Sequence, residues 1–489
     1  MKLFELTKNL ECQIYGDEEI EIEDIVYDSR KVKNGTMFVC LKGENADGHD
    51  YIKSAEQKGA KVVVCERKMK VDVTQVVCQS TRKALSILFA NFYSNPQKDL
   101  KMIAITGTNG KTTSSFLIKN ILEDAGKTVG LIGTQGAFIG QQFFETGMTT
   151  PDPEMLFKLL FEMKENGVEF VVMEASAHAL ELDKLEGIVF EVGLFTNFTQ
   201  DHLDFFGTME KYKQSKLKLF SSKMIKSAVL NFDDPVGKEI AESIDVPYVS
   251  YGLYSPCDIF AIDVNRKISK TEYVVNLLDN VFDVRSNLLG EFNIYNSLGS
   301  AGTCALLGIN EKDIKKGLES LKSVPGRLNS IQLANGATAI IDFAHTPDGV
   351  EKVLTALSNM PFKRIITVVG CGGNRDKSKR PQMGKIAEDL SDFVVLTSDN
   401  PRFENPELII DDIEFGMRKS THTRFADRTI AVHHAIEISR SGDAIAILGK
   451  GAEEYQDING VKSPYNDFEV VRDIDEEMRL EKAILGGQI

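Results

Sequence analysis

The chain has 489 residues, 42% of them hydrophobic, and a formal net charge of −15 at pH 7. This length predicts about three domains with ordinary packed cores. The negative charge argues against a nucleic-acid or membrane-surface binder, because both classes bind through basic faces. The seven cysteines form no zinc or CxxC spacing, and we find no signal peptide or membrane span. We therefore expect a cytoplasmic protein with no nucleic-acid partner and no membrane insertion.

Short runs typical of buried strands recur along the chain, separated by polar or helix-like stretches. They lie at residues 36–41, 61–65, 101–106, 170–173, 192–196, 339–343, 364–369, 393–397 and 444–448. Polar stretches at 93–99 and 323–327 indicate breaks between domains. The predicted domains are therefore residues 1–98, 99–326 and 327–489.

This alternation of strands and helices predicts an α/β fold. The central domain should contain a P-loop-type, mostly parallel sheet with helices on both faces. The C-terminal domain should be an open, Rossmann-like α/β sheet. The N-terminal domain should be a smaller α/β unit.

A glycine-rich loop follows the strand predicted at 101–106 and leads into a helix predicted at 112–123. The loop consists of Gly107, Thr108, Asn109, Gly110, Lys111, Thr112 and Thr113. Backbone N–H groups in such a turn bind phosphate oxygens, aided by the helix N-terminus. Lys111 would neutralise the outer phosphates, and the Thr112 hydroxyl would bind magnesium. An ordinary glycine turn is the alternative, because Ile105 replaces the first glycine of the strict pattern. The order of strand, turn and helix favours a nucleotide site.

Two further polar side chains follow predicted strands. Glu174 ends the strand at 170–173, and His202 follows the strand at 192–196. Open α/β sheets bind ligands at the carboxyl ends of their strands. Either residue alone is more often structural, but beside a phosphate loop they predict a magnesium site.

The loop sequence GTNGKTT resembles the ATP loop of the Mur ligases and of their folylpolyglutamate synthetase relatives. The segment with Asn293 is similar to the family's GxFNxxN motif on the adenine side. Arg327 matches an arginine that approaches the phosphates, and Asp342 and His345 lie in a segment similar to (D)YAHTPD. The resemblance implies an ATP-dependent ligase whose active site closes across a hinge, which excludes water from a reactive intermediate.

Mur ligases carry a carbamylated lysine at the spacing that Lys216 has after the DHLD motif of residues 201–204. Composition alone would favour a solvated helix face, since three other lysines lie within five residues. The resemblance instead implies a carbamate on Lys216, derived from carbon dioxide, that serves as an anionic ligand for a second magnesium ion. Only a neutral amine reacts with carbon dioxide, so the pKa of unmodified Lys216 should lie below the usual value of about 10.4.

The resemblance also assigns residues to a UDP-linked muramoyl peptide, UDP-MurNAc-L-Ala-D-Glu. These residues are Ser29 for the nucleotide and Thr149, Thr150, Ser176 and Lys184 for the muramoyl-peptide portion. The chain departs from the family pattern here, because Lys184 replaces an arginine and Met148 and Ala177 replace polar residues. A lysine keeps the positive charge but not the bidentate geometry of an arginine.

C-terminal segments resemble the branch of the family that adds diaminopimelate. The residues concerned are Arg375, Asp399, Asn400, Pro401, Arg402, Gly449 and Glu453. Diaminopimelate differs from lysine by a distal carboxylate, which a guanidinium such as that of Arg402 would pair. Leaving that guanidinium unpaired would cost roughly 2–5 kcal/mol and so reject lysine. Glu453 would take the distal ammonium, although Ala452 replaces a frequent histidine beside it.

The implied reaction uses ATP to activate the D-Glu γ-carboxylate as an acyl phosphate, which the amine of meso-diaminopimelate attacks, in peptidoglycan precursor synthesis. We expect a monomer. Two alternatives stay open. One is a ligase of the same fold that adds L-lysine or another amino acid. The other is a catalytically silent paralogue that binds UDP-sugar peptides.

Overall fold

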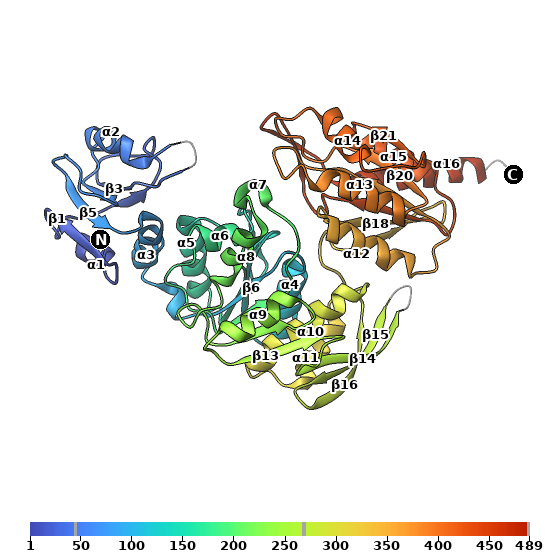
Figure 1. Cartoon of the computed structure of the whole chain (residues 1–489), viewed down its shortest axis with the longest axis horizontal. Coiled ribbons are helices and arrows are strands. Elements are labelled where there is room, and N and C mark those ends of the chain that lie inside the picture. The colour runs from blue at the N-terminus through green and yellow to red at the C-terminus, as the bar shows by residue number, and fades with distance from the viewer. Residues whose placement is uncertain (44–45, 267–269, 487–489) are drawn as a thin grey trace.

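The computed structural model describes residues 1–43, 46–266 and 270–486, which form three α/β units in a row (Figure 1). A five-stranded sheet lies at one end, an eleven-stranded sheet in the middle and a six-stranded sheet at the other end. The predicted α/β fold with three domains is confirmed, whereas the predicted boundaries after residues 98 and 326 remain proposals. None of the described helices combines the length and hydropathy that a membrane crossing requires.

The N-terminal unit is a small sheet whose strands are parallel except for β1 at one edge. In spatial order the strands are β1 (Cys12–Tyr15), β5 (Thr74–Cys78), β4 (Val62–Cys65), β3 (Thr36–Val39) and β2 (Asp24–Val26). Its helices are α1 (Leu3–Leu6), η1 (Gly48–Tyr51), α2 (Ile52–Gln57), α3 (Thr81–Phe92) and η2 (Pro96–Lys98). Helix α3 packs against α5 of the central unit. The apolar core therefore continues from one unit into the next.

The central sheet is parallel from β14 to β7 and ends in antiparallel hairpins on both sides. Its order is β16 (Asn280–Ser286), β15 (Thr271–Leu277), β14 (Ile259–Arg266), β13 (Tyr248–Gly252), β12 (Ala228–Asn231), β11 (Val192–Phe195), β6 (Lys101–Thr106), β10 (Phe170–Glu174), β7 (Val129–Gly133), β8 (Gly136–Ile139) and β9 (Gln142–Phe144). Its helices are α4 (Lys111–Asp124), α5 (Pro153–Glu165), α6 (Ala177–Glu181), α7 (Leu203–Phe206), α8 (Met209–Leu217), α9 (Pro235–Ser243), α10 (Glu291–Leu306) and α11 (Glu311–Ser320).

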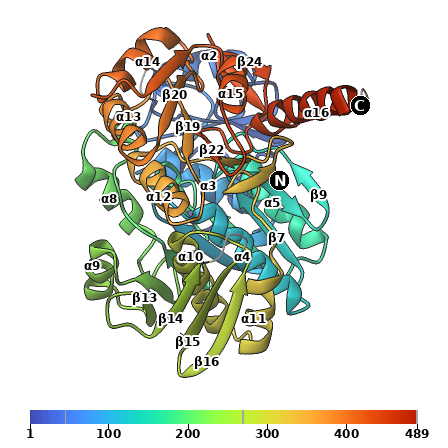
Figure 2. The same cartoon turned by 90° about the vertical axis from the view of Figure 1, so that its right-hand side faces the viewer.

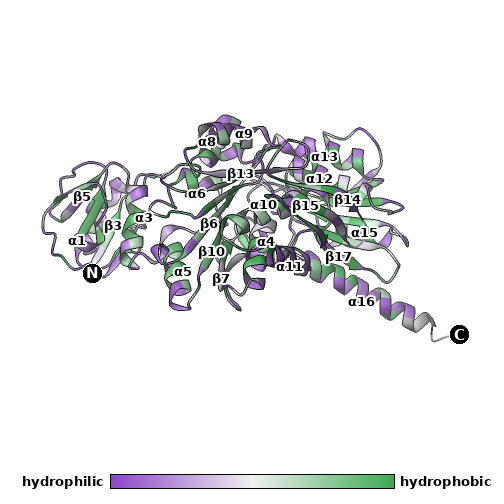
Figure 3. Cartoon of the chain, turned by 90° about the horizontal axis from the view of Figure 1, so that it is seen from below, coloured by the Kyte–Doolittle hydropathy of each residue, from purple (hydrophilic) through white to green (hydrophobic). Residues whose placement is uncertain are grey.

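Strand β6 lies in the middle of this sheet and is buried on both faces. Its side chains alternate, so Met102 and Ala104 join one core cluster while Ile103 and Ile105 join the other. Helices α4 and α10 cover the second face and α5 the first. The apolar strands therefore run between helices with polar outer faces (Figure 3). A continuous apolar run, rather than an alternating one, is what such a doubly covered parallel strand requires.

The C-terminal unit is a sheet whose strands are parallel except for β17. Its order is β17 (Asn329–Gln332), β18 (Thr338–Asp342), β22 (Ala444–Leu448), β19 (Ile365–Val369), β20 (Phe393–Thr397) and β21 (His422–Phe425). The helices are α12 (Pro347–Ser358), α13 (Lys379–Leu390), α14 (Pro406–Glu414), α15 (Arg428–Glu437) and α16 (Asp467–Gly486), and a separate hairpin contains β23 (Tyr455–Ile458) and β24 (Val461–Pro464). Helix α16 extends away from the body of the unit (Figure 2).

The carboxyl ends of the central and C-terminal sheets face each other. The loop after β6 contacts the start of α12, where Asn109 Nδ2 donates to Asp348 Oδ2 at 2.7 Å. The loop after β11 contacts the loop after β19, where Gln200 Nε2 donates to Asp376 Oδ2 at 3.2 Å. Ligands bind at this edge in open α/β sheets. The topology therefore brings two such edges together at one place.

Candidate active site

The phosphate loop, residues 107–113, connects β6 to α4 at the carboxyl edge of the central sheet. Gly107 has a φ of +145°, and a Cβ there would lie 1.9 Å from the Thr196 hydroxyl oxygen, so a side chain does not fit. The loop is held by β11, because Asn109 N donates to Asn197 Oδ1 at 2.9 Å. The first backbone N–H groups of α4 have no partners inside the helix and stand at the end of the loop. This arrangement is suited to binding phosphate.

Two lysine side chains meet beneath the loop. Lys111 Nζ donates to the carbonyl oxygens of Gly107 and Thr108, at 2.9 Å each, and Lys216 Nζ donates to the same Gly107 oxygen at 2.8 Å. Burial lowers the pKa of Lys111. Burial, together with the charge of Lys111, lowers the pKa of Lys216 well below its usual value. The expectation that Lys216 has a depressed pKa is thus supported by its surroundings.

Lys216 differs from the other lysines of α8. It is 2% exposed and lies 4.6 Å from the centre of the Tyr212 ring. Lys213 instead pairs with Glu239 at 2.9 Å at the surface. The interpretation of this helix as a wholly solvated face is therefore wrong for Lys216. Tyr212 also contacts the phosphate loop, since its hydroxyl lies 3.2 Å from the Thr108 hydroxyl. Sequence reasoning did not identify this tyrosine.

Glu174 ends β10 and is fully buried beside the start of α4. Thr112 Oγ1 donates to its Oε2 at 3.2 Å, and the Thr134 hydroxyl donates to the same oxygen at 2.9 Å. Arg327 Nη2, from the connection to the C-terminal unit, donates to Thr112 Oγ1 at 3.1 Å. Thr112 and Glu174 thus place two oxygen atoms that could bind a metal ion next to each other beside the phosphate loop. Thr134 follows β7, and no motif in the sequence indicated it.

His202 lies on the opposite side of the loop, in a left-handed backbone conformation with φ of +55°. Burial lowers its pKa to about 3, against the opposing charge of Asp201, whose Oδ2 lies 3.3 Å from His202 Nε2. The imidazole is therefore neutral at neutral pH, which is the form that binds metals.

The four predicted metal ligands form two pairs rather than one cluster. Thr112 contacts Glu174, whereas His202 and Lys216 both pack against Tyr212, at 5.8 Å between ring centroids and 4.6 Å from Nζ to the ring. Within the described residues, no three His, Cys, Asp or Glu side chains are grouped closely enough to hold a metal ion. The first pair offers oxygen ligands of the kind that magnesium prefers. The second pair fits a magnesium ion only if Lys216 carries an anionic group.

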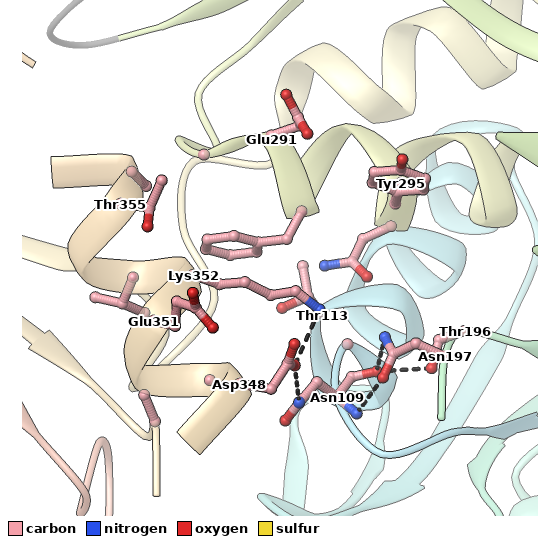
Figure 4. A pocket seen from close by; sticks show the side chains of 18 of the residues that line it. Asn109, Thr113, Thr196, Asn197, Glu291, Tyr295, Asp348, Glu351, Lys352 and Thr355 are labelled. Carbon is pink, nitrogen blue, oxygen red and sulfur yellow. Dashed lines mark hydrogen bonds and ion pairs between the residues drawn. The ribbon is translucent and has the colours of Figure 1, made fainter. Parts of the chain in front are cut away.

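A cavity of about 580 Å³ opens between the phosphate loop and the C-terminal unit. Among the predicted nucleotide-binding residues it is lined by Asn109, Gly110, Thr113, Arg327, Asp342 and His345. Figure 4 shows that the Asp348 carboxylate, on α12, accepts hydrogen bonds from Asn109 and from Lys352 at this cavity. Asn293 does not line the cavity. Its side chain instead accepts a hydrogen bond from Asn296 at 2.9 Å, and Asn296 is the residue that reaches the wall.

Asp342 and His345 line this cavity from the C-terminal unit. Asp342 ends β18 and accepts hydrogen bonds from the backbone N–H groups of Leu328 and Ala344, at 2.8 Å each, which fixes the chain next to Arg327. Burial raises the pKa of Asp342. His345 Nε2 lies 3.9 Å from Asp201 Oδ2, and burial lowers the pKa of this histidine.

The residues assigned to the muramoyl peptide gather around the end of β10. Thr150 Oγ1 donates to the Glu174 carbonyl oxygen at 2.7 Å and lies 3.1 Å from the Ser176 hydroxyl. Thr149 Oγ1 lies 3.1 Å from Thr134 Oγ1. These side chains therefore adjoin the carboxylate that faces the phosphate loop.

Lys184 belongs to the same group and is 8% exposed. Its Nζ pairs with Asp152 Oδ1 at 2.8 Å and lies 3.6 Å from Met148 Sδ. Two of the departures from the family pattern, Lys184 and Met148, are thus in contact with each other.

Ser29 lies on the N-terminal unit, in the turn after β2. Its carbonyl oxygen accepts a hydrogen bond from Lys58 Nζ at 2.8 Å. A cavity of about 220 Å³ next to this turn is lined by Tyr27 and Asp28 from the N-terminal unit and by Glu154 from α5. Ser29 adjoins that cavity without lining it.

The segments assigned to the incoming amino acid follow β20 and β22. These two strands flank β19, and both segments begin at the carboxyl edge of the C-terminal sheet. Asn400 Nδ2 donates to Glu453 Oε2 at 2.9 Å, so the two segments are joined. Arg402 has a φ of +51°, and its Nη1 donates to the Gly373 carbonyl oxygen at 2.9 Å. The structure therefore brings the segments of Asn400, Arg402 and Glu453 to one edge.

The remaining predicted residues of this end take different places. Gly449 has a φ of +115°, and a Cβ there would lie 2.6 Å from Asp399 Oδ2, so the two segments pack closely. Pro401 is buried in the turn. Arg375 is half-exposed and points to the central unit, with Nη1 3.6 Å from Asp204 Oδ2. Arg375 therefore bridges the two units.

Comparison with known proteins identifies the family. Three family models match: the Mur ligase family catalytic domain at residues 21–93, the Mur ligase middle domain at 105–304 and the Mur ligase glutamate ligase domain at 326–451. The chain belongs to the Mur ligase family. A Mur ligase of this kind is an ATP-dependent enzyme that forms amide bonds.

Individual relatives cover nearly the whole chain. The UDP-N-acetylmuramoyl-L-alanyl-D-glutamate–2,6-diaminopimelate ligase of Clostridium botulinum is 42% identical over 98% of this chain and all of its own length. The protein of the same description from Bacillus licheniformis is 40% identical over 96% of this chain and 98% of its own. A solved structure of a ligase with that description covers 98% of this chain and 99% of its own, with 29% identity and a TM-score of 0.70.

More distant Mur ligases share the fold. MurF ligase from Thermotoga maritima, solved in complex with ADP, is 21% identical, covers 96% of this chain and all of its own, and has a TM-score of 0.62.

Sequence reasoning missed several side chains of this Mur ligase. Lys450 lies inside the segment that was singled out for Gly449 and Glu453, and it is fully buried there. Lys379 begins α13, and its Nζ lies 3.8 Å from Asp201 Oδ1. A lysine signals neither burial nor a distant partner in sequence alone, so the pattern held no sign of these contacts.

Proposed function

We propose that this Mur ligase joins meso-diaminopimelate to the D-Glu γ-carboxylate of UDP-MurNAc-L-Ala-D-Glu, in the synthesis of peptidoglycan precursors. The observation that carries the proposal is the hydrogen bond that connects the turn at 399–402 to Glu453, from Asn400 Nδ2 to Glu453 Oε2. It sets the backbone of Arg402 beside the Asn400–Glu453 contact, since Arg402 N donates to the Asp457 carbonyl and Asp457 N donates to Asn400 Oδ1. The descriptions of the curated relatives support the same reaction.

Charge complementarity favours diaminopimelate over lysine at this edge. The distal carbon of diaminopimelate bears an ammonium and a carboxylate. Glu453 supplies the negative partner and Arg402 the positive one, and a guanidinium binds a carboxylate through two parallel hydrogen bonds. Lysine would leave Arg402 without its partner, at roughly 2–5 kcal/mol on the usual cost of an unpaired buried charge.

The central unit binds the nucleotide. The N-terminus of α4 and the backbone of the phosphate loop hold the phosphates, and Lys111 and Arg327 add positive charge beside them. Phosphoryl transfer needs little covalent help from a protein, so positioning and charge stabilisation account for most of the catalysis. The hinge residues Asp342 and His345 close the cavity over the nucleotide.

Magnesium would be held at two places, of which only the first has oxygen ligands alone. Thr112 and Glu174 would hold one ion at the phosphate loop. His202 and a carbamate on Lys216 would hold a second. When bound, the ions neutralise charge on the phosphates.

The proposed carbamate rests on the surroundings of Lys216. Its amine reacts with carbon dioxide in the neutral form, with formation of an N–C bond and loss of a proton. Burial next to Lys111 lowers the pKa of Lys216 and so makes that neutral form more accessible than in an exposed lysine. The modification also removes a positive charge from a buried place, which relieves repulsion between the two lysines.

The proposed reaction has two steps. Side chains of Thr149, Thr150, Ser176 and Lys184 hold the muramoyl peptide so that a γ-carboxylate oxygen attacks the γ-phosphorus of ATP and ADP leaves. The amine of diaminopimelate attacks the resulting acyl carbon, the amide C–N bond forms as the acyl C–O bond breaks, and phosphate leaves with the proton that the amine gives up. Contacts between the central and C-terminal units, such as Asn109 with Asp348, exclude water from the acyl phosphate.

The domains, oligomeric state and compartment of the enzyme complete the proposal. We propose domains at residues 1–98, 99–326 and 327–489, with Ser29 of the first near the UDP group. A monomer contains every residue that the reaction uses. The cytoplasm supplies ATP, and the seven cysteines are all free, as expected in a reducing compartment.

The test is the mass of the product formed with ATP and UDP-MurNAc-L-Ala-D-Glu when equal amounts of meso-diaminopimelate and L-lysine compete. We expect the diaminopimelate adduct to dominate by at least about thirtyfold, the ratio that corresponds to the lower cost of an unpaired charge. A predominant lysine adduct would show a ligase with another acceptor. Absence of ADP release with all substrates present would show a silent paralogue.

A further inference from the structure

A buried lysine joins the two segments that the proposed function assigns to the incoming amino acid. Lys450 follows β22 and is 0% exposed. Its Nζ donates to Glu453 Oε2 at 2.8 Å and to Asn400 Oδ1 at 3.1 Å, and it lies 3.8 Å from Asp399 Oδ1. A cation without solvent contact thus lies between the turn at 399–402 and the residues after Gly449.

These contacts fix the orientation of two neighbouring side chains. Asn400 Oδ1 accepts hydrogen bonds from Lys450 and from Asp457 N, so its Nδ2 must point to Glu453. Glu453 Oε2 accepts from both Lys450 and Asn400. In the part of the chain that the structure describes, no hydrogen bond reaches Glu453 Oε1, and this side chain is 26% exposed. Oε2 is therefore fixed by two hydrogen bonds, and Oε1 can accept a hydrogen bond from a ligand.

The charges around Lys450 also favour a cationic ligand at Glu453. Asp399 and Glu453 carry two negative charges close to Lys450, so the lysine leaves the group with one net negative charge. A single net charge suits one ammonium group. Without Lys450, Glu453 would keep only the hydrogen bond from Asn400, and no lysine would offset the repulsion between its carboxylate and that of Asp399.

We propose that Lys450 is a positioning residue for the incoming amino acid: it holds Glu453 through Oε2 so that Oε1 accepts the distal ammonium of a diamino dicarboxylic acid. This inference rests on the proposed function. Lys450 does not touch the substrate; it acts through Glu453 and Asn400.

Steady-state kinetics of the full-length enzyme test this role. Lys450→Met keeps the side-chain length and removes the charge. We expect it to raise KM for meso-diaminopimelate by at least about tenfold, while KM for ATP stays within about twofold. Lys385→Met is the matched control, since Lys385 makes an exposed ion pair with Asp389 at 3.3 Å in the same domain, and it should change neither KM. An unchanged KM for diaminopimelate in Lys450→Met would overturn the inference, as would an equal rise in both KM values.

A second comparison separates positioning from a general effect on folding. Lys450→Met/Glu453→Gln removes both charges and should fold even if Lys450→Met does not. Because Lys450 acts through Glu453, the double variant should have a KM for diaminopimelate within about threefold of that of Glu453→Gln alone. A further tenfold rise would contradict the inference. Failure of the wild-type enzyme to use diaminopimelate would instead contradict the proposed function.

Discussion

Burial, rather than residue type, sets the chemistry of the lysines around the phosphate loop. Lys216 and Lys213 lie three positions apart on α8. Lys213 pairs with Glu239 at the surface, whereas Lys216 is buried against the Gly107 carbonyl and Tyr212. The first therefore keeps its charge, and the second has a pKa well below the usual value.

Lys216→Ala should lose most of the activity, by about a hundredfold or more, because it removes the group that would carry the carbamate. Added formate or acetate should restore part of the rate, since a small carboxylate can occupy the space that the side chain leaves. The measurement is ADP release with all substrates present, and Lys213→Ala is the matched control, with a rate within about twofold of wild type. Wild-type rates in Lys216→Ala would refute the carbamate.

The sequence was enough to predict that Glu174, His202 and Lys216 lie near the phosphate loop, because each follows a strand or motif at a recognisable position. It could not predict the grouping of these residues into two pairs, which depends on how the chain segments around the phosphate loop and α8 come together in space. It also could not indicate Thr134, which follows β7 with no motif around it. Side chains that support a ligand residue are those that lie near it in space, and sequence spacing does not give that distance.

At the scale of elements, the buried parallel strands were the best predicted. The predicted bounds of β6, β20 and β22 match the structure, and those of the other predicted strands differ by one or two residues at an end. Such strands are continuous apolar runs that stand out in the sequence. The hairpin strands β15 and β16 were not predicted, because β15 alternates buried and half-buried residues and β16 is mostly exposed. The buried parallel strands β7 and β12 were missed as well.

One ion-pair cluster connects the loops around the amino-acid site. Arg380 at the start of α13 is 1% exposed, and it donates to Glu404 Oε1 at 2.9 Å and to Asp412 Oδ2 at 2.8 Å. Glu404 follows the turn at 399–402 and also accepts a hydrogen bond from Asn374 N. The hydrogen bond from Arg380 lowers the pKa of Glu404 to about 2.

This depressed pKa predicts how stability depends on pH. The unfolded chain should titrate near the ordinary value of 4.5. The stabilisation is therefore fully present above that pH and is lost as the pH falls from about 4.5 to about 2, since the unfolded state binds the proton first. Glu404→Gln should lower the thermal unfolding midpoint of the C-terminal domain at pH 6 and have roughly half that effect or less at about pH 3. An equal effect at both values would show that the ionised carboxylate is not the stabilising form.

At the scale of the whole molecule, the nucleotide cavity forms where the central and C-terminal units meet. The motifs predicted which residues would serve the nucleotide and which the amino acid. The contact between Asn109 and Asp348, however, joins residues 239 positions apart, and the sequence gives no geometry for such a pair. The contacts between the central and C-terminal units are therefore a finding of the structure alone.

The most direct measurement of the central claim is the position of meso-diaminopimelate in a crystal of the full-length enzyme grown with the ligand and a non-hydrolysable ATP analogue. We expect the distal carboxylate on the Arg402 guanidinium, the distal ammonium on Glu453 Oε1 and the other amine directed to the phosphate loop. Diaminopimelate bound away from the turn at 399–402 would contradict the account.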